Sequence, residues 1–263
     1  MSDALLISAL VLSFVCVLGW LWQVRERNAG HVDVIWSAGV GGASVFYCLM
    51  AEGSVVVRVT CGLLLAVWSW RLAHHIHRRV AGQKEDGRYQ SMRIALGSRI
   101  NLFHFFFFQG QALLAWLFAL PAWVIARGAS EVSLFWLLTG TLLAVVAMIG
   151  EATADSQLAQ FRADPNNQGK SCRAGLWRYS RHPNYFFEWL HWVAYPLIAI
   201  GVSGGAWLWI APLMMFLFLW FVTGIPYTEK QAIKSRGDDY RQYQQETSMF
   251  FPWWPKSGQE SSS

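Results

Sequence analysis

Ionisable and amide side chains gather at the start of an otherwise apolar segment, at Arg181, His182, Asn184 and Glu188. Pro183 suits the first turn of a helix, so the arginine and the histidine fall just before that helix. Asn184 and Glu188 are four residues apart and share one helical face. Ionisable groups inside a membrane span are costly and usually mark a site, and a helix N-terminus beside arginines favours phosphate. The pattern predicts polar chemistry just inside a membrane, next to an anion site.

Glu188 has two interpretations from the sequence alone. It could be a structural partner of His191, three residues further along the same face, or of an arginine within a helix bundle. Alternatively, burial keeps its carboxyl protonated, so that it donates a hydrogen bond to a substrate oxygen. Four residues from the helix start is roughly 6 Å of depth at 1.5 Å per residue. A lipid-soluble substrate reaches that depth, and a cofactor held at the cytoplasmic surface lies close to it.

The composition sets the environment in which these residues work. Of the 263 residues, 54% are hydrophobic and only 14% are charged, which argues against a soluble globular domain. Seven apolar runs are long enough to be read as membrane spans, and lipid favours helices over strands there. They cover residues 4–22, 34–50, 54–70, 100–125, 132–150, 185–202 and 206–223. The prediction is an all-α integral membrane protein with seven transmembrane helices.

The basic residues give the orientation of these helices. All but two of the 21 Lys and Arg residues lie in segments 25–27, 71–99, 162–181 and 230–256. An outside N-terminus and a cytoplasmic C-terminus place all four segments in the cytoplasm, as the positive-inside rule requires. The net charge of +5 therefore reflects topology and does not indicate nucleic-acid binding. The four cysteines imply no disulfide framework.

The chain is predicted to form one membrane domain over residues 1–256, followed by a disordered tail at 257–263. Segments 71–99 and 155–183 are predicted to be cytoplasmic loops that bind a cofactor. The tail from Pro226 carries three tyrosines among charges and ends in Phe250-Phe-Pro-Trp-Trp254. Aromatic clusters of this kind favour the lipid–water boundary, so this tail is expected to lie along the membrane surface.

Four further polar or aromatic residues within the spans allow two interpretations each. Gln109 and Gln111 could form hydrogen bonds between helices or line a ligand cavity. Asp33 and Trp36 could anchor a helix at the interface or line the same kind of cavity. We predict that all four contact the substrate.

Two other patterns are assigned to structure. His74, His75 and His77 end the third apolar run, but the remaining histidines are scattered singly, so no metal site is predicted. The glycines in Gly39-Val-Gly-Gly lie inside a span without a preceding strand. Close helix packing is therefore the preferred interpretation, and a dinucleotide loop is not.

Seven motifs together resemble the steroid 5α-reductase family, particularly its bacterial branch, over nearly the whole chain. The most specific is Arg181-His-Pro-Asn-Tyr-Phe-x-Glu188. The others are Asp33-x-x-Trp36, Trp68-Ser-x-Arg71, Glu85-Asp-x-Arg-Tyr89, Gly175-Leu-Trp-x-Tyr179, Thr223-Gly-Ile-Pro226 and Thr247-Ser-Met-x-x-Pro252. The resemblance implies seven transmembrane helices, a location in a bacterial inner membrane, and reduction of the 4-ene double bond of 3-oxo steroids with NADPH.

The resemblance also implies roles for individual residues. Glu188 resembles the glutamate that hydrogen-bonds the steroid carbonyl, and Asn184 the asparagine beside the nicotinamide carboxamide. The residues expected at the cofactor are Arg78, Arg88, Tyr89, Asp155, Arg162, Lys170, Arg173, Tyr179, Arg181, His182, Asn184 and Tyr240. In the animal enzymes a tyrosine three residues before the arginine that matches Arg78 assists the carbonyl contact. Here that position is His75, so His75, Tyr89 or Tyr185 is expected to take this catalytic role.

The alternative functions differ in the ligand they need. Isoprenylcysteine carboxyl methyltransferases carry similar Arg-His-Pro strings and use S-adenosylmethionine, while a transporter or a lipid-binding protein would need neither cofactor. The number of arginines favours the reductase, because NADPH carries three phosphates and S-adenosylmethionine carries none. The expected partners are a lipid-soluble steroid or enone substrate and membrane lipids, without nucleic acid, and the protein is expected to be a monomer.

Overall fold

The computed structural model describes residues 2–81, 85–222 and 224–256, and its secondary structure over these residues is entirely helical. Six helices within this part of the chain are long and apolar enough to cross a membrane. They are Asp3–Glu26, His31–Met50, Val55–Val80, Gly87–Arg127, Leu134–Ala163 and Gly205–Arg236. The chain is therefore an all-α, multi-pass membrane protein. Thr223 and the tail 257–263, which was predicted to be disordered, lie outside the described residues.

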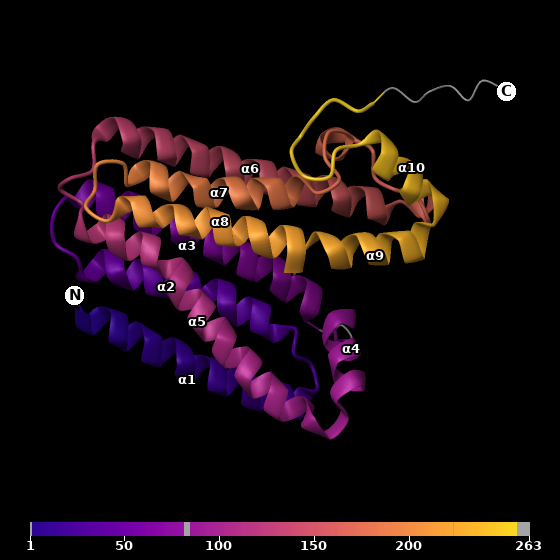
Figure 1. Ribbon diagram of the computed structural model, residues 1–263, viewed down its shortest axis with the longest axis horizontal. Helices are drawn as coiled ribbons and strands as arrows, with labels where there is room; N and C mark the ends of the chain where they lie inside the picture. The colour runs from indigo at the N-terminus through magenta and orange to yellow at the C-terminus, as the bar shows by residue number, and fades with distance from the viewer. Residues whose placement is uncertain (1, 82–84, 223, 257–263) are drawn as a thin grey trace. The chain divides into compact units, whose positions relative to one another are not determined.

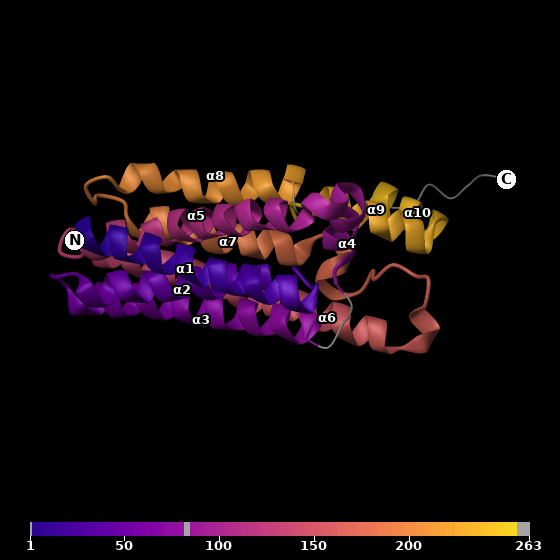
Figure 2. The same ribbon diagram turned by 90° about the horizontal axis from the view of Figure 1, so that it is seen from below.

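The chain forms two compact units, the first of which comprises residues 1–137 and 198–208. Its helices are α1 (Ser2–Glu26), α2 (His31–Met50), α3 (Val55–Val80), α4 (Gly87–Leu96) and α5 (Ile100–Arg127), with the short η1 (Gly97–Arg99) before α5. Helix α2 packs against α1, α3 and α5, and the long helices run side by side (Figures 1 and 2). Helix α4 is a short element that contacts the start of α5.

Glycines and small polar side chains allow close packing in this first unit. A Cβ atom at Gly41 of α2 would collide with the Ser69 side chain of α3, and one at Gly39 would lie 2.7 Å from the Leu12 side chain of α1. The Ser69 hydroxyl also donates to the Ser37 carbonyl oxygen over 2.7 Å. The helix-packing interpretation of the 39–42 glycine run is thus confirmed for Gly39 and Gly41.

The second unit comprises residues 138–197 and 209–263. It contains α6 (Leu134–Ala163) from Leu138 onward, α7 (Pro183–Ile198), α8 (Ile210–Leu217), α9 (Ile225–Arg236) and α10 (Asp238–Glu246), with the π-helical turn η5 (Phe218–Val222) after α8. Two 3-10 turns, η2 (Pro165–Asn167) and η3 (Gly175–Arg178), lie between α6 and α7, and η4 (Gly205–Trp209) precedes α8. Helices α6 and α7 approach closely at Gly150, where a Cβ atom would collide with the Phe187 ring.

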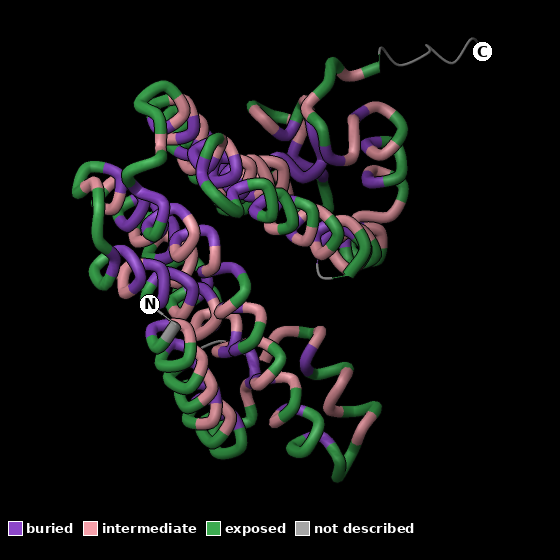
Figure 3. The backbone as a smooth tube through the Cα atoms, turned by 60° about the vertical axis from the view of Figure 1, so that its left-hand side comes forward, coloured by how far each residue is buried: buried purple, intermediate pink, exposed green. Residues whose placement is uncertain are grey.

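Both units expose apolar side chains on one face of their long helices. On α1, Leu6, Leu10 and Phe14 follow a four-residue spacing and are each more than 60% exposed. On α6, Leu138 and Leu142 repeat this pattern. Figure 3 shows exposed residues recurring along the helices. A soluble protein would bury these faces, whereas lipid is a suitable neighbour for them.

The observed helices differ from the predicted spans at three ends. Helix α3 continues past residue 70 to Val80, and α6 continues past residue 150 to Ala163, so the segments expected to be loops begin as helices. The sixth apolar run yields only the 16 residues of α7. About 20 residues are usually needed to cross a bilayer, which is why six helices meet the length of a span where seven were predicted. The turn after α7 contains Gly201 and Gly204, both with positive φ.

Candidate functional site

The segment that precedes α7 is fixed to α6 by hydrogen bonds. Gly175 has a left-handed backbone (φ 57°), and the Gln157 side chain occupies the space that a Cβ atom would need. The backbone N–H of Leu176 donates to Gln157 Oε1 (2.9 Å), and the Trp177 indole donates to the Ala154 carbonyl oxygen (2.9 Å). The Gly175-Leu-Trp motif is thereby explained as a docking element that positions the start of α7.

Pro183 is the first residue of α7, as predicted, and Asn184 follows it in the first turn. The Asn184 amide group donates to Asp155 Oδ1 of α6 over 3.2 Å, while its own Oδ1 accepts from the backbone N–H of Tyr185 over 3.0 Å. The orientation of this amide is therefore set by two partners. Asn184 and Asp155 were both predicted at the cofactor, and the structure brings them together.

Glu188 lies one turn further along α7, with 7% of its surface exposed. Its Oε1 accepts a hydrogen bond from the Trp192 indole over 2.9 Å. His191 contacts the Tyr195 hydroxyl through Nε2, over 2.8 Å. The structural pairing of Glu188 with His191 stays a prediction. The result is a buried carboxyl about 6 Å along the helix axis from an oriented amide.

Arg181 and His182 converge on Glu229 of α9, a residue that the sequence reasoning missed. Arg181 Nε donates to Glu229 Oε1 over 2.8 Å, and Nη1 donates to the carbonyl oxygens of Gln244 and Thr247 over 3.0 and 2.6 Å. His182 Nε2 lies 3.3 Å from the same carboxylate oxygen. The guanidinium was predicted to bind phosphate, but the contacts shown here link α7 to the tail. A phosphate contact of Arg181 or His182 stays a prediction.

Two tyrosines complete this cluster. The Tyr240 hydroxyl donates to Glu229 Oε1 over 3.3 Å, and Tyr185 stacks on the His182 ring and contacts Thr228 over 3.2 Å. Burial lowers the pKa of His182 below its ordinary value, although the Glu229 carboxylate opposes that effect. Burial and the same carboxylate raise the pKa of Tyr240. A neutral imidazole and a protonated phenol therefore lie beside Glu229 at neutral pH.

One feature of the sequence could have indicated Glu229. It is the only acidic residue between Glu188 and Asp238.

The C-terminal tail lies alongside the segment before α7. The Arg181 N–H donates to the Ser248 carbonyl oxygen (2.8 Å), the Ser180 hydroxyl to that of Phe250 (2.8 Å), and the Trp253 N–H to that of Tyr179 (2.9 Å). These bonds give the Thr247-Ser-Met-x-x-Pro252 motif a structural role.

The expectation that the whole aromatic tail lies at the surface is wrong for Phe250. This residue is 1% exposed, and its ring contacts those of Phe216 and Trp220, with centroids 5.4 and 5.7 Å apart. Trp253 and Trp254 are exposed, as an interfacial position requires. The physical reason for the difference is that Phe250 fills the space between aromatic side chains of α7, α8 and η5.

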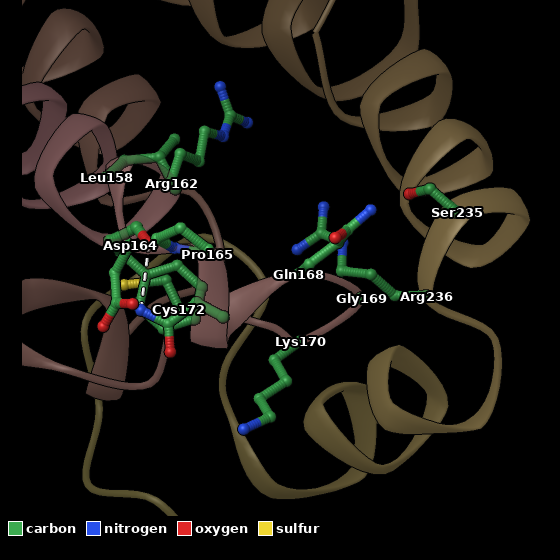
Figure 4. Close-up of a pocket in the computed structure, with 12 residues that line it drawn as sticks. Leu158, Arg162, Asp164, Pro165, Gln168, Gly169, Lys170, Cys172, Ser235 and Arg236 are labelled. Carbon is green, nitrogen blue, oxygen red and sulfur yellow. Dashed lines mark hydrogen bonds between the residues drawn. The ribbon is translucent and has the colours of Figure 1, made fainter.

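A basic cavity of about 530 Å³ lies between the end of α6, the loop at 164–172 and the end of α9 (Figure 4). Arg162, Lys170 and Arg236 are its cations. In the close-up Arg236 extends from α9 towards the loop, whereas Arg162 and Lys170 point to opposite sides of it. Arg162 and Lys170 were predicted to bind the cofactor. Arg236 was missed, because as part of a charged tail it informed only the topology.

Arg173, also predicted to bind the cofactor, pairs instead with the short helix α10. Its Nη1 lies 2.8 Å from Asp239 Oδ1, and its Nε lies 3.5 Å from Glu246 Oε2. Asp239 also accepts from the backbone N–H of Ser171 over 2.6 Å. Although burial opposes it, hydrogen bonds from Ser171 and Arg173 lower the pKa of Asp239. Arg173 therefore fixes the loop that borders the basic cavity.

In the first unit, Asp33 of α2 contacts two residues of α4. Arg88 Nη2 lies 3.2 Å from Asp33 Oδ2, and the Tyr89 hydroxyl donates to Asp33 Oδ1 over 3.0 Å. Glu85 caps the start of α2 at the Ala29 N–H and also pairs with Arg93 (2.8 Å). The structure thus brings Asp33, which was predicted at the substrate, together with Arg88 and Tyr89, which were both predicted at the cofactor. In this arrangement the Tyr89 hydroxyl donates its proton to a carboxylate.

Two of the other residues predicted for the substrate, Gln109 and Trp36, contact neighbouring helices. Gln109 Oε1 accepts from the Ser13 hydroxyl over 2.7 Å, which favours its interhelical interpretation. The Trp36 ring packs edge-on against those of Trp68 and Phe118. Gln111 is half-buried in α5.

The histidine-rich end of α3 carries His75 and Arg78, both exposed. Their roles at the carbonyl and at the cofactor stay predictions. No group of three His, Cys, Asp or Glu side chains that could hold a metal ion occurs in the described part of the chain.

The class of protein is therefore a helical membrane protein with an oriented amide, Asn184, and a buried carboxyl, Glu188, in the first two turns of α7. A basic cavity lies in the same unit. The chain matches the family model described as "Protein of unknown function (DUF1295)" over residues 19–247, and it belongs to that family. It is 26% identical to the uncharacterized protein C594.04c of Schizosaccharomyces pombe over 272 residues, covering 92% of this chain and 78% of the relative. No solved structure matches the chain.

Proposed function

We propose that this protein is an NADPH-dependent membrane reductase that transfers a hydride to the 4-ene double bond of a 3-oxo-4-ene steroid or a similar lipid enone. The observation that carries the proposal is the arrangement on α7. Asn184 is oriented by Asp155, and the buried Glu188 follows one turn later. Such a reaction needs an amide that can hydrogen-bond the nicotinamide carboxamide. It also needs a buried carboxyl that can hydrogen-bond the carbonyl oxygen of the substrate.

The residues of the second unit fit a phosphate-bearing cofactor. The cavity lined by Arg162, Lys170 and Arg236 supplies positive charge for phosphate groups, and guanidinium groups bind phosphate with charge-assisted hydrogen bonds. Asn184 offers a separate amide for the other end of such a ligand. When bound, NADPH supplies the hydride, which is chemistry that no side chain of the protein provides.

Glu188 would donate a hydrogen bond to the substrate carbonyl oxygen. Addition of a hydride to the β-carbon of an enone builds negative charge on the carbonyl oxygen. A preorganised hydrogen-bond donor at that oxygen lowers the barrier, and loss of one such donor typically costs about 10²–10³-fold in rate. A protonated Glu188 can be this donor, with the Trp192 indole holding its Oε1 in place. The apolar surroundings of α7 keep water away from the reacting oxygen.

The cofactor proposal can be tested by thermal unfolding of the detergent-solubilised protein. We expect NADPH to raise the apparent melting temperature, because a ligand that binds only the folded state stabilises it by mass action. S-Adenosylmethionine at the same concentration serves as the comparison and should have no effect. Stabilisation by S-adenosylmethionine alone would instead favour a membrane methyltransferase, and absence of any effect from NADPH would reject the reductase.

We also propose that α7 crosses the membrane, which gives seven spans with the N-terminus outside and the C-terminus in the cytoplasm, in a bacterial inner membrane. A helix shorter than the bilayer is accommodated by local thinning of the lipid at modest cost. The expected result is that a reporter fused after Ser263 is cytoplasmic and a tag before Met1 is on the opposite side. Because an even number of spans would put both ends on one side, that outcome would show that α7 does not cross.

A further inference from the structure

An apolar groove of about 570 Å³ lies between α1 and α2 of the first unit. Ser8 is the one polar residue among the described residues that line it, and its hydroxyl is already hydrogen-bonded to that of Tyr47 over 2.5 Å. The lining therefore favours a hydrocarbon chain over a polar ligand. Its apolar residues include Val11 and Val15 of α1 and Ile35, Ala38, Gly42 and Phe46 of α2.

Gly42 leaves space along this groove. Beyond its own turn of helix, a Cβ atom at Gly42 would meet no described atom within 4 Å, whereas one at Gly39 would lie 2.7 Å from the Leu12 side chain. From Val34 to Phe46 the groove extends about 18 Å along α2, close to one leaflet, roughly 15 Å, of a hydrocarbon core about 30 Å thick. Both helices are long and apolar enough to cross a membrane, so lipid is the medium beside the groove.

The same helix faces continue from the groove to the end of α1 and the start of α2. On α1, Trp22 follows Val15 by seven residues and Arg25 follows Trp22 by three, so all three share one face. On α2, His31 is one turn before Ile35. The Trp22 and His31 rings stack, with centroids 4.2 Å apart and planes at 11°. Tryptophan beside the end of a span typically marks the level of the lipid headgroups.

Basic side chains lie near this stacked pair. Arg25 and Arg27 are exposed, and His77 at the end of α3 is close enough to His31 for an electrostatic interaction, as is the acidic Glu26. Arg27 has a left-handed backbone (φ 53°), which residues other than glycine rarely adopt. Glycine would adopt it without strain, so what the arginine adds is its charge. Figure 2 shows the end of α1, the start of α2 and the end of α3 at the same end of the first unit.

We propose that this surface binds an anionic phospholipid, with one acyl chain in the groove and the phosphate beside Arg25, Arg27 and His31. Arginine binds phosphate through charge-assisted hydrogen bonds. In the orientation proposed above this end faces the cytoplasm, where basic residues next to a span attract anionic lipids. A zwitterionic lipid would fill the groove equally well, but its own cation competes with the arginines for its phosphate. The site is separate from the proposed hydride transfer, so neither proposal depends on the other.

The test counts lipids bound to the purified full chain by native mass spectrometry, at rising concentrations of phosphatidylglycerol or of phosphatidylcholine with the same acyl chains. The wild type should bind its first phosphatidylglycerol more tightly than its first phosphatidylcholine. Arg25→Gln should weaken phosphatidylglycerol about fivefold, the effect of one basic residue near an anionic lipid surface, and leave phosphatidylcholine unchanged. Arg127→Gln is the matched control, because it removes an exposed arginine beside the Trp123 ring at the far end of α5.

Gly42→Leu tests the place of the acyl chain. Because Gly42 lines the groove and has free space around it, a leucine there should occupy the groove and leave the fold intact. The first, tightest lipid should then be lost for both headgroups. Gly110→Leu is the matched control, since Gly110 is also an exposed helical glycine with free space and lies outside the groove. Equal apparent melting temperatures in lipid-free detergent show that each variant is folded.

Three results would overturn the inference. Equal affinity of the wild type for the two lipids, or an effect of Arg127→Gln as large as that of Arg25→Gln, would reject the headgroup site. Lipid binding by Gly42→Leu equal to that by Gly110→Leu would reject the groove as the place of the chain. If Gly42→Leu instead lowers the fraction of dimers in the same spectra, the groove is a contact between two copies of this chain and the lipid proposal is wrong.

Discussion

Replacing Glu188 by alanine should lower the turnover of a 3-oxo-4-ene steroid by about 10²–10³-fold, equivalent to about 2.7–4 kcal/mol of transition-state stabilisation. The alanine side chain has no donor for the carbonyl oxygen on which charge develops. Glu188→Gln should retain part of the activity, because its amide still donates a hydrogen bond. The measurement compares turnover of the three proteins at saturating NADPH.

The affinity for NADPH distinguishes a catalytic from a structural role of Glu188. Asn184 and the basic cavity remain in both variants, so we expect their NADPH dissociation constants to match that of the wild type. Trp192→Phe is a useful companion, because it removes the donor to Glu188 Oε1 while keeping the carboxyl. Near-wild-type turnover in the alanine variant would exclude Glu188 from the mechanism. Loss of NADPH binding together with turnover would show that the substitution had disturbed the fold.

Replacing Arg181 by alanine should destabilise the second unit by about 3–5 kcal/mol, the usual cost of removing one partner from a buried ion pair. The side chains of Arg181 and Glu229 are only 8% and 15% exposed, and the arginine also satisfies two carbonyl oxygens. The measurement is the apparent melting temperature in detergent. Arg173→Ala is the control, because the Arg173–Asp239 pair is about one-third exposed and such pairs contribute at most about 1 kcal/mol.

A double substitution separates the buried charge from the general loss of packing. Arg181→Met combined with Glu229→Leu removes both charges and fills a similar volume, so it should recover much of the stability lost in Arg181→Ala. If Arg181→Ala unfolds no earlier than Arg173→Ala, the guanidinium does not hold the tail in place. Its predicted contact with a phosphate would then become the better explanation of its position.

Helix spacing and proline placement correctly predicted the parts of the site that depend on residues close together in the sequence. Pro183 at the start of α7, the shared face of Asn184 and Glu188, and the close packing at Gly39 and Gly41 all follow from helix geometry over a few residues. Apolar runs likewise located the long helices, because lipid imposes one simple requirement on them.

The parts that could not be predicted depend on partners far apart in the sequence. Arg181 and Glu229 are separated by 48 positions, and no spacing rule indicates that a basic motif and a tail helix should meet. Arg236 likewise borders a cavity whose other walls lie more than 60 positions earlier. The ends of α3 and α6 were missed for a different reason. Charged residues were taken as the end of a span, although a helix can continue beyond the lipid.

The bonds between the tail and the segment before α7 have a consequence for the order in which the protein is completed. Domains form from the N-terminal end as the chain is synthesised, yet the Tyr179 carbonyl oxygen, the Ser180 hydroxyl and the Arg181 N–H have partners at Trp253, Phe250 and Ser248, respectively. The helices can therefore enter the membrane long before the start of α7 is fixed. A chain that stops before residue 247 would lack these partners, so the segment that leads into α7 would lose the bonds that fix it.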